Sequence, residues 1–170
     1  MKHQCIPNTL PALFDFNIGI VHQHGPGELR IHANTGPQED VELIIRMDGR
    51  KHPGPHERFY QGDSIGWYEG DVLVIETTNF TFDPDGLEDH THVPSSTMKK
   101  LTQRWKKVGP DLLDVEFTQE DPMFLKKPWK WTWQYKRIPG PPAGTFDNFT
   151  CDPSDAWDEV RVTGASRYDQ

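Results

Sequence analysis

The chain has 170 residues, which fits one domain with a sizeable core. Its formal net charge is -8 and its 18 Lys and Arg are scattered, whereas a nucleic-acid surface needs basic residues clustered on one face. No apolar run approaches the roughly 20 residues of a membrane-spanning helix, and the first residues lead into no apolar signal core. We therefore expect one soluble domain over residues 1–170, cytoplasmic as given, that binds neither nucleic acid nor membrane.

The composition favours short strands joined by tight turns, because the chain has 15 Pro, 14 Gly and 11% aromatic residues. A period of two in the apolar residues is typical of half-buried strands. This alternation predicts strands at residues 14–22, 28–33, 41–47, 64–69, 72–80 and 98–107, a seventh after the turn at 108–111, and a last one at 129–138.

Eight successive strands with no helical pattern between them fit an up-and-down antiparallel meander, and closure of such a sheet removes its exposed edges. We predict an all-β fold, a closed lipocalin-like barrel that can hold one small ligand. A two-sheet sandwich would produce nearly the same alternation and stays open as an alternative. In a barrel of even strand number both chain ends emerge together, so Cys5 and Cys151 could meet, and a disulfide and a reduced pair are equally open.

The alternation also sends a few polar residues to the inward face: His22, Thr77, Gln103, Gln119 and Glu69. A buried polar group without a partner costs about 1–3 kcal/mol, so each needs a structural hydrogen bond or a function. Histidine titrates near neutral pH, and desolvation among aromatic rings would raise the pKa of a carboxyl toward the same range. We interpret His22, Glu69 and Gln103 as candidate catalytic residues, although an ordinary structural role is the alternative for each.

Aromatic residues dominate the same inward face, most clearly in the last strand, where tryptophans alternate with polar residues. Large flat rings suit an apolar or aromatic small molecule, although plain core packing is the alternative. The predicted ligand-binding residues are Phe16, Trp67, Thr77, Trp105, Gln119, Trp131, Trp133 and Tyr135.

His22, His24 and Glu28 follow the pattern HxHxxxE, which resembles the first metal-binding motif of the cupins. Phe16 stands where the cupin motif has a glycine, and the remaining histidines form no second motif. The three residues lie around a turn, so a solvated hairpin tip is the alternative interpretation. His52, next to a Pro-Gly-Pro turn, is interpreted as part of a rigid loop.

Several segments resemble a widespread, largely uncharacterised bacterial family whose members read DGRxHP, GHSIGxWEGDTLVV, TxEDP and PW. The matching segments are residues 5–7, 48–53, 62–74, 120–122 and 128–129, and with a late Cys the similarity extends from Cys5 to Cys151. The sequence departs from the family pattern at Asp63 for His, Tyr68 for Trp and Gln103 for Glu. Many family members resemble exported proteins with a longer N-terminal part, and the resemblance implies no particular activity.

Three functions are consistent with these observations. The leading hypothesis is a cofactor-free lyase or isomerase that acts on a hydrophobic small molecule inside the barrel, with His22 and Glu69 as proton carriers. The second is a non-catalytic carrier of such a molecule. The third is a cupin-like metal-dependent enzyme that uses HxHxxxE. A homodimer is one assembly state to be considered for each of them.

Overall fold

The computed structural model describes residues 9–14, 18–23, 25–34, 40–84, 86–87 and 93–137. A single 3-10 turn, η1 (Ala12–Phe14), precedes the strands. The strands are β1 (Ile18–Gln23), β2 (Glu28–Asn34), β3 (Asp40–Arg46), β4 (Asp63–Glu69), β5 (Val72–Thr78), β6 (Lys100–Gly109), β7 (Leu112–Glu120) and β8 (Trp129–Lys136). Within these ranges no helix has the length and apolar character needed to span a membrane. Because every described element other than η1 is a strand, the all-β prediction is confirmed.

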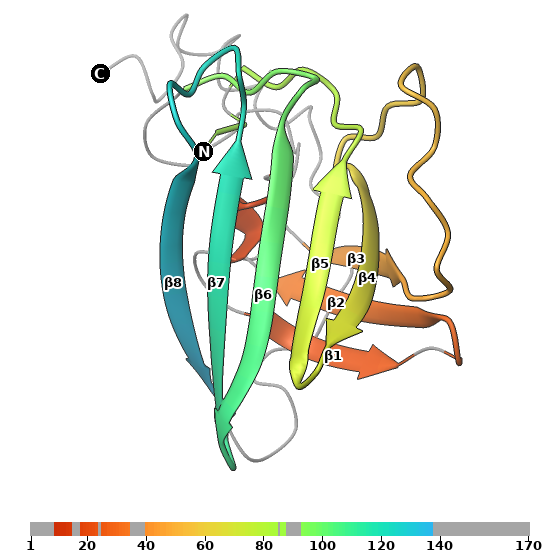
Figure 1. Ribbon diagram of the computed structural model, residues 1–170, viewed down its shortest axis with the longest axis vertical. Coiled ribbons are helices and arrows are strands. Elements are labelled where there is room, and N and C mark those ends of the chain that lie inside the picture. Colours follow the sequence, from red (N-terminus) through yellow and green to blue (C-terminus); the bar gives the residue numbers. More distant parts are fainter. Residues whose placement is uncertain are drawn as a thin grey trace, which may run out of the picture.

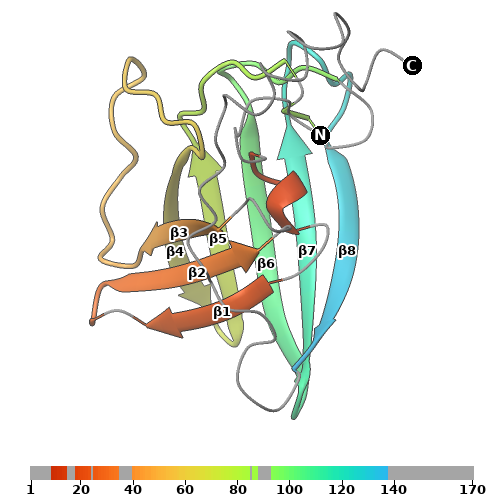
Figure 2. The same cartoon turned by 180° about the vertical axis from the view of Figure 1, so that it is seen from behind.

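All eight strands belong to one sheet, in which their order follows the chain from β1 to β8. Strands β4 to β8 run side by side and curve, while β1 to β3 cross behind them at a steep angle (Figures 1 and 2). The result is a half-barrel, and the predicted closed barrel is wrong. Among the described strands no pairing joins β1 to β8, because β1 to β3 fold across the concave side instead of continuing around it.

The change of direction occurs between β3 and β4, which pair in parallel, at Ile45 with Ser64 and at Arg46 with Ile65. All other neighbouring strands are antiparallel, so the predicted meander is interrupted here. A parallel pair needs a connection longer than a hairpin, and residues 47–62 supply it. The approach is close: a Cβ on Gly66 would lie 2.9 Å from Ile45 Cγ2. Only glycine fits at this position without displacing β3.

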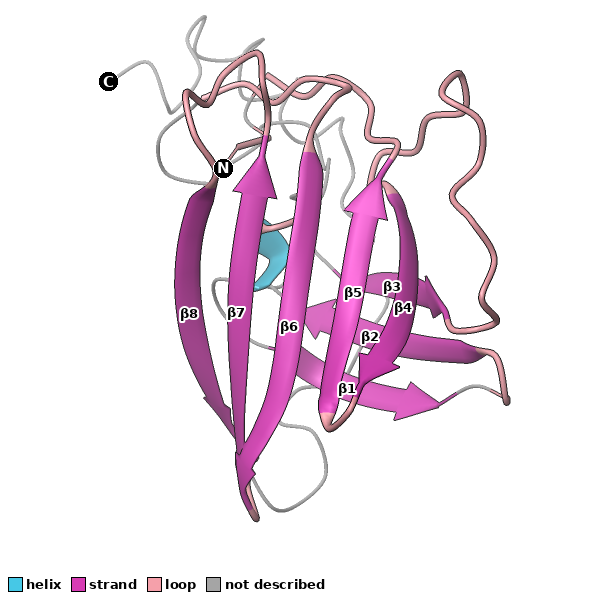
Figure 3. Ribbon diagram, viewed as in Figure 1, coloured by secondary structure: helices cyan, strands magenta, loops and turns pink. Residues whose placement is uncertain are grey.

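The space between the crossing strands is filled with side chains. Ile31 and Ile45 belong to the same buried cluster as Leu101 and Phe117. The helical turn lies on the concave side (Figure 3), and it places the ring of Phe14 5.9 Å from that of Phe117. The sequence predicts a first strand that begins at Phe14, but β1 begins at Ile18, and Phe14 instead packs in the core from η1. The core cluster comprises Leu10, Phe14, Ile31, Val41, Leu43, Ile45, Leu73, Ile75, Phe80, Leu101, Trp105, Val115 and Phe117.

Candidate ligand-binding face

The pairing register arranges the concave side of β4 to β8 into rows of side chains that share one face. The first row is Ser64, Thr77, Leu101, Gln119 and Trp129. The second row is Gly66, Ile75, Gln103, Phe117 and Trp131. The third row is Tyr68, Leu73, Trp105, Val115 and Trp133, and Tyr135 continues the face on β8. The structure thus brings together Thr77, Gln103, Trp105, Gln119, Trp131, Trp133 and Tyr135, whose roles toward a ligand stay predictions.

Trp67 and Glu69 belong to the opposite, convex face, and their predicted inward position is wrong. In β4 the residues that face the interior are Ser64 and Gly66, both buried, because β3 packs closely there and admits only small side chains. The indole of Trp67 is 38% exposed, and its Nε1 donates a hydrogen bond to Glu69 Oε1 at 3.1 Å. The prediction from apolar character alone therefore exchanged the inward and outward faces of β4.

The electrostatics of Glu69 also differ from the expectation. Arg104 Nη2 donates to Glu69 Oε2 at 2.8 Å on the exposed convex surface. This hydrogen bond, followed by the one from Trp67, lowers the pKa of Glu69 below its ordinary value. The predicted rise of the Glu69 pKa by desolvation is therefore wrong. Glu69 is instead a solvated, ionised carboxylate, and it does not lie in the interior where a proton carrier is needed.

The side chains of Thr77 and Gln103, both predicted to face inward, form hydrogen bonds with neighbouring side chains. Thr77 Oγ1 and Ser64 Oγ lie 2.8 Å apart in the buried first row. Gln103 Oε1 accepts a hydrogen bond from Trp105 Nε1 at 3.0 Å, and Gln103 is only 1% exposed. Gln119 differs: its Nε2 donates to a backbone carbonyl, whereas its buried Oε1 has no hydrogen-bond partner among the described residues. Thr77 and Gln103 thus have the structural hydrogen bonds that were the alternative interpretation.

A buried lysine that the sequence analysis did not single out lies at one end of the half-barrel. Lys99 is 1% exposed, and its Nζ donates to the backbone oxygens of Leu10 and Gly86, both at 2.8 Å. The same ammonium group lies 4.2 Å from the centre of the Phe80 ring. These contacts desolvate the charge while stabilising it, and they connect the segment before η1 to the loops between β5 and β6.

Asp121, in the segment that resembles the TxEDP motif, fixes the loop after β7. Its buried carboxylate accepts hydrogen bonds from Ser96 N at 2.6 Å, from Ser96 Oγ at 2.8 Å and from Met123 N at 3.1 Å. Charge-assisted hydrogen bonds of this kind are stronger than neutral ones. The only sequence signal was an Asp-Pro pair directly after a strand, which predicts a turn and not burial.

Aromatic rings from β7 and β8 pack together at the β8 edge of the described sheet. The rings of Phe117 and Trp131 are stacked, with centres 5.0 Å apart and planes 5° apart. Trp131 in turn lies 4.5 Å from Trp129. Trp129 and Trp133 are 38% and 45% exposed although they lie on the concave side. We call Trp129, Trp131 and Trp133 the tryptophan face, a surface fixed on one side by the core and open on the other.

On the convex side, His52 lies between two carboxylates, an arrangement that the sequence analysis did not predict. His52 Nδ1 and Asp63 Oδ2 form a hydrogen bond of 2.6 Å. His52 Nε2 faces Glu76 Oε1 at 3.4 Å, and Lys100 Nζ lies 2.6 Å from the other oxygen of Glu76. Since Nε2 is buried, it is not presented to a substrate. These contacts of His52 connect the segment of residues 47–62 to β4 and β5.

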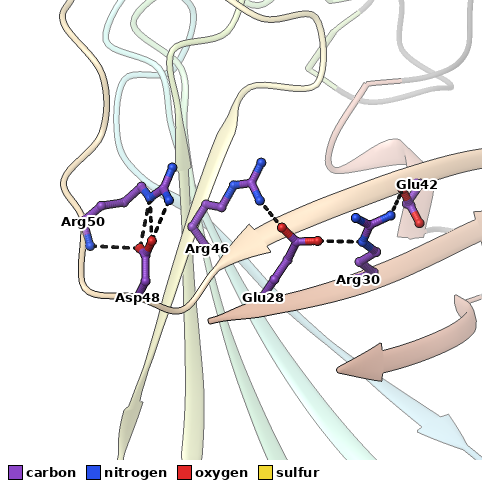
Figure 4. A network of polar contacts seen from close by, with 6 residues as sticks. All are labelled: Glu28, Arg30, Glu42, Arg46, Asp48 and Arg50. Atoms are coloured by element: carbon purple, nitrogen blue, oxygen red, sulfur yellow. Dashed lines mark hydrogen bonds and ion pairs between the residues drawn. The ribbon is translucent and has the colours of Figure 1, made fainter. Parts of the chain in front are cut away.

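The proposed metal ligands do not form a cation site in the described structure. Arg30 Nε donates to Glu28 Oε1 at 2.6 Å, and Arg46 donates to the other carboxylate oxygen (Figure 4). Two guanidinium groups on one carboxylate oppose a metal cation at Glu28. His22 lies in β1 with its side chain outside the description, and His24 and Phe16 lie outside the described residues. No metal-competent cluster of His, Cys, Asp and Glu occurs in the described ranges.

Comparison of the chain with models of protein families, with curated proteins and with solved structures finds no match. The resemblance to an uncharacterised bacterial family therefore stays a prediction. Cys5 and Cys151, which mark the two ends of that resemblance, both lie outside the described residues.

Proposed function

We propose that the protein binds a planar, mainly apolar small molecule against the tryptophan face. The observation that carries the proposal is the exposure of Trp129 and Trp133 on the concave side of β8, directly beside a filled core. Aromatic side chains on the inner side of a curved β-sheet are a common setting for ligands that are apolar and flat.

The rigidity of the tryptophan face supports binding. Trp131 is held by its stack on Phe117, a residue with no exposed surface. Tyr135, at the far end of β8, donates its hydroxyl hydrogen to the Phe14 backbone oxygen at 2.9 Å. Because Trp131 at the centre of the face is already ordered in this way, a ligand that stacks there loses little affinity to side-chain ordering. Each stacking contact adds about 0.5–1.5 kcal/mol beyond the buried area.

Catalysis on such a ligand stays a prediction. Glu69 lies on the convex face, and Gln103 already accepts a hydrogen bond from Trp105. His22 is the remaining candidate proton carrier from the sequence. A binding function requires only the aromatic surface and is therefore the simpler proposal.

The test compares two tryptophans of equal exposure on opposite faces. Trp129 and Trp67 are both 38% exposed, so Trp129→Ala and Trp67→Ala remove similar amounts of accessible ring. Isothermal titration calorimetry with naphthamide, a neutral planar probe, should give about tenfold weaker binding to Trp129→Ala than to the wild type. Trp67→Ala should bind like the wild type.

Circular dichroism would verify that both variants retain the fold. Equal affinity of Trp129→Ala and the wild type, or an equal loss in both variants, would contradict a ligand site on the tryptophan face.

A further inference from the structure

A depression lies directly beside the tryptophan face, at the start of β8. Its volume is about 530 Å³, and its mostly apolar lining comprises Leu125, Lys126, Lys127, Pro128, Trp129 and Lys130. Pockets for small ligands typically have volumes of about 300–1,000 Å³. Trp129 belongs both to this depression and to the tryptophan face, so one molecule can contact both.

The charge of this depression is opposite to that of the protein. Three of its residues are lysines, whereas the whole chain has a formal net charge of -8. In the described part of the chain, none of Lys126, Lys127 and Lys130 forms an ion pair with a carboxylate. Lys100 and Arg104, by contrast, lie 2.6 Å and 2.8 Å from Glu76 and Glu69. The ammonium groups of Lys126 and Lys127 are thus available to an anion beside Trp129, whereas Lys130 follows Trp129 in β8 and belongs to the convex face.

The loop that holds these lysines is fixed from within. Phe124 N and Leu125 N donate to the Asp121 backbone oxygen at 3.2 Å and 2.7 Å, and the Asp121 side chain is buried and bound to Ser96. On the other side of the depression the chain enters β8, where Trp129 lies against Trp131. The lysines therefore start from anchored backbone on both sides, which limits the ordering cost of binding.

We infer that the ligand of the tryptophan face is an aromatic acid, an anion whose flat ring lies on Trp129 while its acidic group meets Lys126 and Lys127. This inference rests on the proposed function and adds the charge of the ligand to it. A carboxylate and a phosphate share the relevant chemistry, because each is a compact anion that accepts hydrogen bonds from ammonium groups.

The experiment uses two probes of the same shape. Naphthoate and naphthamide, substituted at the same ring position, differ in charge but hardly in size. Calorimetry should give about tenfold tighter binding of naphthoate to the wild type. The double variant Lys126→Gln/Lys127→Gln should bind both probes equally. The control Lys51→Gln/Lys107→Gln removes the same charge from exposed lysines elsewhere, and it should keep the wild-type preference for naphthoate.

Two results would overturn the inference while leaving the proposed function intact: equal affinity of the wild type for both probes, or an equal loss of preference in the test and control variants. The second result would indicate a general effect of net charge. Failure of the wild type to bind naphthamide would instead contradict the proposed function. The neutral probe thus reports on the tryptophan face, and the difference between probes reports on the lysines.

Discussion

The concave face of β4 to β8 has a covered part on β7 and an uncovered part on β8. On β7 the side chains of Val115 and Phe117 have no exposed surface, because η1 and the crossing strands β2 and β3 lie over them. On the same face of β8, Trp133, which pairs with Val115, is 45% exposed, and Trp129, which pairs with the buried Gln119, is 38% exposed. Both strands have the same alternation of apolar and polar residues. The comparison teaches that periodicity determines which residues share a face, whereas the path of distant strands determines which of them are covered.

The largest expected effect separates these two parts by stability. Phe117→Ala should lower the free energy of unfolding by about 3–5 kcal/mol, because it leaves a cavity in the covered part. Trp133→Ala should cost about 1 kcal/mol, because nearly half of its surface is already in water. Urea denaturation measures both. Similar losses in the two variants would mean that β8 is as covered as β7.

A smaller effect tests whether the loop beside the tryptophan face is anchored by Asp121. Asp121→Ala leaves the buried donors of Ser96 without their acceptor and should cost about 2–3 kcal/mol in thermal or urea unfolding. Glu116→Ala, on the exposed convex side of β7, should stay within about 0.5 kcal/mol of the wild type. Indistinguishable stabilities of the two variants would show that Asp121 does not hold this loop.

The smallest effect concerns the surface away from both parts. Arg50 donates to Asp48 from its side chain and, at 3.2 Å, from its backbone N–H (Figure 4). These hydrogen bonds lower the pKa of Asp48 from 3.8 to about 2. A depressed pKa means that the stabilisation is present above pH 3.8 and is lost as the pH falls toward 2.

Carbon-detected NMR titration should therefore give an Asp48 midpoint near 2 in the wild type. In Arg50→Ala the midpoint should return toward about 3.9, the usual value for Asp. Naphthamide affinity should be unchanged in this variant, since the pair is remote in sequence from β8. An Asp48 midpoint that is insensitive to Arg50→Ala would contradict the assigned cause.

Local rules predicted the strands well because alternation and turn residues act within a few positions. β2, β3, β5 and β8 begin and end within two residues of the expected ranges. The closed barrel failed because nothing local indicates that β3 will pair in parallel with β4 after residues 47–62. The burial of Lys99 and Asp121 could not be predicted from the sequence either, because it depends on loops from other parts of the chain.

The candidate site was predicted in part. The alternation placed the residues of β5 to β8 on a common face, but β4 was inverted. The sequence feature that indicates the true orientation of β4 is its pair of small residues, Ser64 and Gly66. These residues face inward because β3 leaves no room for larger side chains there, and the larger Trp67 faces outward. Size, and not apolar character, decides orientation there, and the error placed Glu69 inside as well.

The most direct test of the account follows the indole N–H signals of the tryptophans by NMR during a titration of the wild type with naphthamide. A ligand on the tryptophan face should shift the signals of Trp129, Trp131 and Trp133 in a saturable manner. The signals of Trp67, on the convex side, and of Trp105, whose N–H is bonded to Gln103, should stay in place. Saturable shifts confined to Trp67, or no saturable shift in any indole, would contradict the claim that the uncovered part of the concave face is the binding site.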